Sequence, residues 1–272
     1  MIEVILVLFA LIIGSIIDIK IREVPDTLNY SLIILGFLLA IASSIYSTSL
    51  MPLIGSIGGF LIATSISLLL FYSGQWGGGD AKLLMGIGAI KGLSIGIFGF
   101  YFILEFFILT MLAGAIYGVF WMIYLAIKNK DEFIKQYKKL NTKKIIFIKK
   151  VMLLISIFII LFSILLNPYL ELTILIIALL FTLFFSLYLF LTVKAVENGC
   201  MVKKIGVNKL VEGDWVVGSK KLSELKIEVD KTGISKEQID IIKKNKIKSI
   251  VVKEGIPFVP SFLLAYLFIL LW

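Results

Sequence analysis

Residues 75–82 read Gln-Trp-Gly-Gly-Gly-Asp-Ala-Lys, and this stretch lies where one long apolar run ends and the next begins. Its position predicts a turn of the chain at a membrane face. Gly77, Gly78 and Gly79 can adopt positive φ and allow the main chain to approach another segment closely. Asp80 heads the next helical stretch, where the amides of a helix N-terminus favour a carboxylate. Taken alone, the stretch is as compatible with a purely structural role, a flexible turn followed by an N-cap aspartate, as with a functional one.

The composition predicts a membrane protein. Of the 272 residues, 60% are hydrophobic, and the mean hydropathy is +1.04. Several apolar runs reach the roughly 18 residues that a bilayer crossing needs. The chain has no histidine, which excludes Ser-His-Asp and Cys-His triads and the His-Glu-x-x-His zinc site. The single cysteine, Cys200, excludes an internal disulfide. We expect neither a cofactor nor a metal ion.

The apolar runs predict an all-α polytopic membrane protein with about eight transmembrane helices and a small cytoplasmic α+β domain. The expected spans are 2–17, 28–45, 53–72, two within 83–127, then 151–166, 170–193 and 257–272. The break inside 83–127 is expected near Lys91-Gly92 or at 96–99. The sequence leaves open whether the first helix of this pair is short or partly re-entrant.

Changes in composition divide the chain into five parts. They are a membrane core with both aspartate motifs at 1–127, a basic cytoplasmic loop at 128–150, two additional spans at 151–193, the small cytoplasmic domain at 194–255 and a last span at 256–272. In the small domain, Ser235 and Gln238 have the spacing of a capping box and predict the start of a helix.

The distribution of charge predicts the orientation. With eight spans and the N-terminus outside, Lys91 is the only one of the 27 Lys and Arg residues that lies away from the cytoplasmic segments. This asymmetry follows the positive-inside rule and places the glycine stretch at the cytoplasmic face of the cell membrane. The net charge of +9 indicates membrane lipid as a partner and gives no argument for nucleic acid.

A second carboxylate, Asp18, lies at the end of the first apolar run, at the same predicted face as Asp80. Carboxylates near a membrane are costly and are therefore functional candidates. Two carboxylates within a few ångströms share one proton. One can then act as a general base on water while the other acts as a general acid towards a peptide carbonyl. The alternative for Asp18 is an interfacial charge paired with Lys20 or Arg22.

Two motifs resemble those of the type IV prepilin peptidases. The first consists of Asp18, Arg22, Val24-Pro25-Asp26 and Leu28-Asn29. The second, residues 77–83, resembles the Gly-x-Gly-Asp signature that names this class of intramembrane aspartyl proteases. Residues 255–262 are similar to the start of the family's last helix. The archaeal preflagellin and prepilin peptidases are the most similar branch, because Cys200 alone cannot supply the paired Cys-x-x-Cys motifs of the bacterial branch.

The resemblance implies that Asp18 and Asp80 are the catalytic pair. It also implies a core of six spans and cleavage of class III signal peptides, short basic leaders, from preflagellins or prepilins. We expect the glycines at 77–79 to admit an extended substrate backbone. Glu23 and Asp26 are candidate contacts for the basic leader, and their alternative is a solvated or helix-capping role.

Three other functions compete with a protease. An ion-coupled transporter also places carboxylates beside broken helices, but the two halves show no inverted repeat. A Ser/Lys hydrolase would use Ser219 and Lys220, which lie in a polar segment. The third alternative is a scaffold without an active site.

Overall fold

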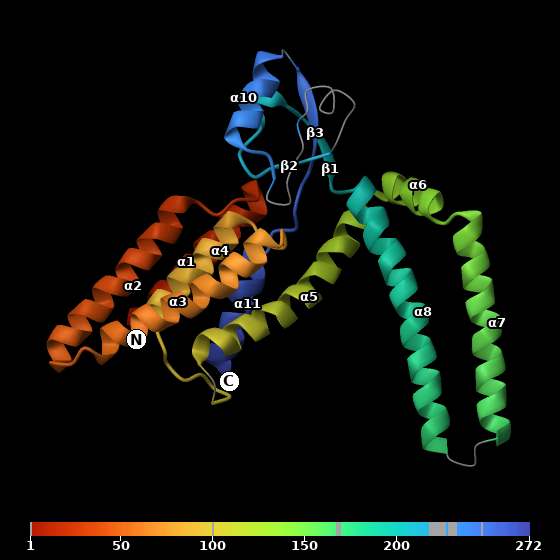
Figure 1. The fold of residues 1–272 in the computed structure, drawn as a ribbon, viewed down its shortest axis with the longest axis horizontal. Helices are drawn as coiled ribbons and strands as arrows, with labels where there is room; N and C mark the ends of the chain where they lie inside the picture. Colours follow the sequence, from red (N-terminus) through yellow and green to blue (C-terminus); the bar gives the residue numbers. More distant parts are fainter. Residues whose placement is uncertain (1, 100, 167–169, 218–226, 228–232, 246) are drawn as a thin grey trace. The chain divides into compact units, whose positions relative to one another are not determined.

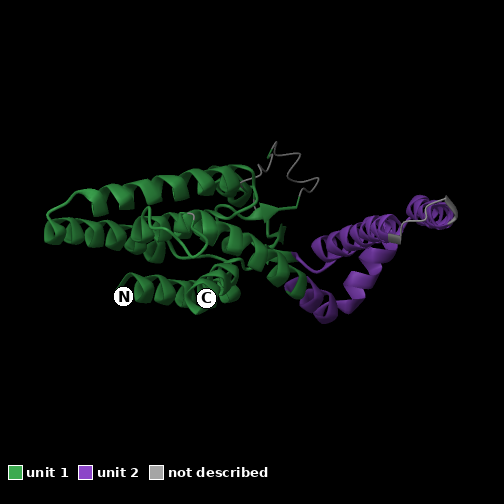
Figure 2. Cartoon of the chain, turned by 90° about the horizontal axis from the view of Figure 1, so that it is seen from below, with its two compact units in different colours: residues 1–120, 203–272 green, residues 121–202 purple. Residues whose placement is uncertain are grey.

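The computed structural model describes residues 2–99, 101–166, 170–217, 227, 233–245 and 247–272. Ser219 and Lys220, the residues of the hydrolase alternative, lie outside this part. The chain divides into two compact units, residues 1–120 with 203–272 and residues 121–202 (Figure 2). Within the described residues, six helices are long and apolar enough to cross a membrane. The chain is therefore a mostly helical, multi-pass membrane protein.

The first unit is a helical bundle with a small sheet. Its helices are α1 (Ile2–Ile21), α2 (Asp26–Ser47), α3 (Met51–Tyr72), α4 (Gly78–Lys91), α5 (Phe102–Lys128), which continues into the second unit, and α11 (Val259–Leu271). Figure 1 shows both termini at the end of this bundle away from the sheet.

Helix α4 is the buried helix of this bundle. It lies between α2 and α3, and small residues permit the close packing. A Cβ on Gly36 of α2 would lie 2.8 Å from the backbone of Ala89, and one on Gly59 of α3 would lie 2.5 Å from the carbonyl oxygen of Gly88. The hydroxyl of Ser67 in α3 donates to the carbonyl of the α4 residue Ala81 at 2.9 Å. These contacts fix α4 along its whole length.

The expectation of eight full spans is met only in part. Helix α4 has 14 residues and α11 has 13, about 20 Å each at 1.5 Å per residue, which is shorter than the bilayer core. Helix α4 ends at Lys91, and Gly92 caps it with φ +58°, at one of the two predicted breaks. The following loop is held by Glu105, whose Oε1 accepts a hydrogen bond from the N–H of Phe98 at 2.8 Å.

Among the described residues, a three-stranded sheet and one helix form the small α+β part. The elements are β1 (Val202–Gly206), the 3₁₀ turn η1 (Val207–Lys209), β2 (Trp215–Val216), α10 (Lys236–Lys244) and β3 (Ser249–Lys253), and the sheet order is β1-β3-β2. Strands β2 and β3 pair antiparallel. The predicted capping box is confirmed, since Ser235 and Gln238 bond each other's backbone at the start of α10. Strand β3 leads through residues 254–258 into α11.

The second unit contains α6 (Lys130–Leu140), α7 (Lys143–Leu166) and α8 (Leu170–Gly199). The stretch 128–150, expected as a loop, is therefore largely helical. Its many lysines lower the mean hydropathy of a segment that also has an apolar stripe. On this stripe, Phe133 and Tyr137 lie one turn apart, with 5.9 Å between their ring centroids. Helix α8 likewise continues to Gly199, past the expected end of the span at 193.

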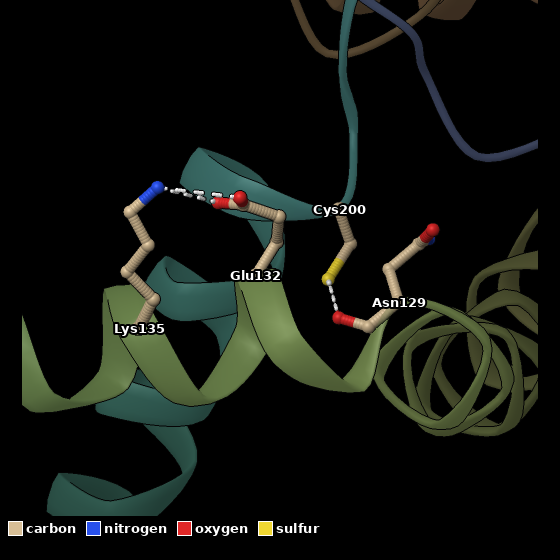
Figure 3. A network of polar contacts seen from close by, with 4 residues as sticks. All are labelled: Asn129, Glu132, Lys135 and Cys200. Carbon is tan, nitrogen blue, oxygen red and sulfur yellow. Dashed lines mark hydrogen bonds and ion pairs between the residues drawn. The ribbon is translucent and has the colours of Figure 1, made fainter.

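Helix α6 packs against the end of α8. A Cβ on Gly199 would lie 2.9 Å from Cγ of Gln136, so the glycine permits the close approach. Figure 3 shows the neighbouring polar contacts, in which the Cys200 thiol donates to the carbonyl of Asn129 at 3.9 Å and Lys135 pairs with Glu132 at 3.3 Å. The buried cysteine thus has a local structural contact.

Candidate active site

Asp18 lies in the last turn of α1, and only 5% of its surface is exposed. Its Oδ2 accepts a hydrogen bond from the backbone N–H of Val259 at 2.9 Å. Val259 is the first residue of α11. The guanidinium of Arg22 lies close enough to interact electrostatically with the carboxylate. Asp18 is thus a buried carboxylate with an amide donor and a nearby positive charge.

Arg22 directly follows α1 and has a backbone conformation that is unusual for a residue other than glycine. Its φ is +62°, in the left-handed region that costs a non-glycine residue roughly 1–2 kcal/mol. Its N–H donates to the carbonyl of Asp18 at 2.9 Å. This turn redirects the chain from the end of α1 towards Val24, which is buried.

The loop after Asp18 packs directly on the glycine stretch. A Cβ on Gly79 would lie 3.0 Å from Cβ and 3.1 Å from the backbone nitrogen of Val24. The side-chain amide of Asn29, which is fully buried, donates to the carbonyl of Gly79 at 3.1 Å. The two predicted aspartate motifs therefore form one joint structure, and Gly79 has no room for a side chain.

Asp80 occupies the first turn of α4, with Gly77 as the N-cap residue. Its carboxylate lies against Gly77, where a Cβ would be 3.5 Å from Oδ2. Asp80 and Asp18 are close enough for their charges to interact. Gly77 is exposed, and the atom nearest to a Cβ on Gly78 is a ring carbon of Phe71 at 3.7 Å. Two of the three glycines thus have only ordinary contacts around a Cβ and are not crowded by neighbouring backbone.

The two other acidic candidates differ in their surroundings. Asp26 forms an ion pair with Lys82 at 2.6 Å, and this pair joins α2 to α4. Glu23 is exposed. Partial burial, together with the carboxylate of Asp214 in the small α+β part, raises the pKa of Glu23. Burial also raises the pKa of Asp214, and the carboxylate of Glu254 adds to this shift. Glu23 therefore faces further negative charge.

Trp76 anchors the loop before α4. It is 6% exposed, and its ring lies 5.3 Å from that of Phe262, 5.6 Å from that of Phe258 and 6.2 Å from that of Phe107. Sequence reasoning assigned no role to Trp76 or to the amide of Val259. For the amide of Val259, the sequence signal was the similarity of residues 255–262 to the start of the last helix in a known family. In the described ranges, no three acidic or cysteine side chains form a group suited to a metal ion.

The N-terminal part of the chain matches a known class of membrane peptidases. Residues 5–119 match the model of the type IV leader peptidase family. The matched segment contains Asp18 and Asp80, and the match confirms the resemblance predicted from their motifs.

Individual relatives carry a more specific name. The chain is 42% identical over 83 residues to a preflagellin peptidase of Methanococcus voltae, over 30% of this chain and 35% of that protein. It is 43% identical over 90 residues to a preflagellin peptidase of Methanococcus maripaludis, over 33% and 39% of the two chains. A third, from Methanocaldococcus jannaschii, is 39% identical over 80 residues, over 29% and 34%. The chain thus spans little more than a third of the length of these curated relatives.

Proposed function

We propose that this protein is an aspartic endopeptidase that removes the short basic leader from preflagellin-like or prepilin-like proteins at the cytoplasmic face of the cell membrane. The observation that carries the proposal is the joining of the two aspartate motifs, in which Val24 packs on Gly79 and Asn29 bonds its carbonyl. This contact lies within the segment that matches leader peptidases. The relatives named preflagellin peptidase support the substrate class.

The carboxylates of Asp18 and Asp80 act as one pair in this mechanism. Because like charges at close range cannot easily both ionise, the pair holds a single proton. The ionised member takes a proton from a water molecule, whose oxygen attacks the scissile carbonyl carbon. The protonated member donates its proton to the carbonyl oxygen. Collapse of the tetrahedral intermediate breaks the C–N bond, and the amine leaves with a proton from the pair. One hydroxyl of the intermediate returns a proton to the pair as the new carboxylic acid forms, so the pair again holds a single proton.

The open side of the glycine stretch suits an extended substrate. Gly77 and Gly78 present backbone without side chains next to Asp80, so a peptide main chain can approach the carboxylate closely. Glu23 is the better of the two candidate leader contacts, because Asp26 is already paired with Lys82. The exposed Glu23 and the nearby Asp214 would attract a basic leader. The apolar part of the substrate would lie in the lipid beside the bundle.

The proposed orientation has the N-terminus outside and the aspartate pair inside. It rests on the concentration of lysine and arginine in the segments next to the site and in residues 128–150 and 194–255. The matching relatives are peptidases, and they give no support to an ion-coupled transporter.

Cleavage of a tagged preflagellin in membranes that contain the full chain tests the proposal. Asp18→Asn and Asp80→Asn keep the side-chain shape and remove the titratable group, so each should abolish cutting. Asp131→Asn is the matched control, because Asp131 is exposed on α6 in the second unit. Cutting that survives either of the first two changes, at equal expression, would exclude that aspartate from the chemistry. Failure of the parent to cut several basic leaders would overturn the proposed function.

A further inference from the structure

We propose that the backbone N–H of Val259 positions the carboxylate of Asp18 for catalysis, so that the first turn of α11 is a third component of the active site beside the two aspartate motifs. The inference rests on the proposed function. Its basis is the 2.9 Å hydrogen bond from this amide to Oδ2 of Asp18, which joins residues 241 positions apart. Val259 lies outside the segment that matches the leader peptidase family.

The residues around Val259 leave this amide available for Asp18. The first N–H groups of a helix have no partner within the helix. Pro260 has no N–H, and the N–H of Ser261 bonds the carbonyl of Phe258 at 2.9 Å. Val259 is therefore the residue of this first turn whose amide can serve a group outside the helix. The backbone of Phe258 also lies close enough to Asp18 to interact with its carboxylate.

Three neighbouring segments fix the start of α11. A Cβ on Gly14 of α1 would lie 3.3 Å from Cγ1 of Val259, and a Cβ on Gly114 of α5 would lie 2.5 Å from the ring of Phe258. The ring of Trp76, in the loop that leads to Asp80, packs on the same Phe258 at 5.6 Å. The amide donor is thus held by α1, by α5 and by the glycine loop.

This arrangement gives the two oxygens of Asp18 different tasks. Oδ2 is engaged by Val259, so Oδ1 is the atom that can share the proton with Asp80 or take one from water. An amide donor also stabilises the ionised form of a carboxylate. Its removal would weaken the hold on the orientation of this carboxylate and would favour the protonated form of the pair. Errors of about 1 Å in such positions reduce rates by about 100-fold.

The test replaces the N–H at position 259 by an oxygen, through cell-free synthesis of the full chain with the α-hydroxy analogue of valine. This change keeps the side chain. It also avoids proline, which would disfavour the ψ of −23° at Phe258. The same ester change at Leu267, in the middle of α11, is the control and reports the general effect of a weakened helix.

We expect the ester at position 259 to lower kcat for leader cleavage by roughly 10- to 100-fold, with KM within about twofold of the parent. The pH–rate profile of the aspartate pair should move to higher pH. The Leu267 ester should keep the parent's profile. The positioning role alone would be overturned if the ester at position 259 kept the parent's kcat and pH–rate profile. It would also be overturned if the Leu267 ester lost as much kcat and the ester at position 259 did not shift the pH–rate profile. A parent that cuts no leader would overturn the proposed function and this role with it.

Discussion

Substitution of Gly79 by alanine tests how closely the two aspartate motifs must fit. The new methyl group would lie 3.0 Å from Cβ, 3.1 Å from the backbone nitrogen and 3.3 Å from the carbonyl oxygen of Val24. Ordinary carbon contacts are about 3.5–4.0 Å. The start of α4 or the loop that follows Asp18 must therefore give way by a few tenths of an ångström. Two of the three atoms are backbone and cannot rotate out of the way.

This shift would change the relative position of the two carboxylates. A displacement of about 1 Å costs about 100-fold in rate, so a shift of a few tenths of an ångström should make Gly79→Ala cut a tagged preflagellin about 4- to 10-fold more slowly. The overpacked contact should also lower the free energy of unfolding by about 1–3 kcal/mol. Initial cleavage rates in membranes with matched amounts of protein measure the first effect, and thermal unfolding in detergent measures the second.

Gly118→Ala is the control, since residue 118 also lies in a helix, α5, and gains the same helix propensity. No atom would lie within 4 Å of its new methyl group. We expect this variant to cut within about twofold of the parent. A Gly79→Ala protein that cuts as fast as the parent would refute the reasoning, and so would equal losses in the two variants.

Three further changes have expected outcomes. Asp26→Asn breaks the partly exposed ion pair with Lys82 and should cost less than about 1 kcal/mol; a double-mutant cycle with Lys82→Met in thermal unfolding measures the coupling. Asn29→Leu removes the buried hydrogen bond between the motifs and should cost about 1–3 kcal/mol, seen as a lower Tm and slower cutting. Glu23 and Asp214 repel each other only when ionised, and both have raised pKa values. Their repulsion therefore appears as pH rises through those values, and Glu23→Gln should raise Tm at about pH 7 and leave it unchanged near pH 4.

The sequence predicted the apolar helices and the two aspartate motifs well, because each has a strong local signal. The end of α4 lies at Lys91-Gly92, one of the two predicted breaks, where glycine permits the φ of +58°. The short length of α4 was not evident, because the loop that follows carries exposed apolar residues such as Ile95 and Phe98. Their hydropathy continues that of the helices on both sides.

Other features had no signal in side-chain composition. The hydrogen bond from Val259 to Asp18 comes from the backbone, so residue type reveals only that a proline follows it. Packing of Val24 on Gly79 depends on the tertiary approach of two segments, and the sequence shows only that a glycine is present. Helix α6 was hidden by its lysines, which dominate the average hydropathy of a segment whose apolar residues nevertheless recur at helical spacing.

The 241-residue separation between Asp18 and its amide donor has a consequence for the timing of synthesis. Translation at about 5–20 residues per second needs roughly 10–50 s to cover that separation. Asp80 leaves the ribosome early in this interval, so both carboxylates are made well before α11. During this time the nascent chain carries both aspartates without the segment that donates a hydrogen bond to one of them. If the proposed function and the proposed role of Val259 are correct, full activity would begin only after the late helix inserts.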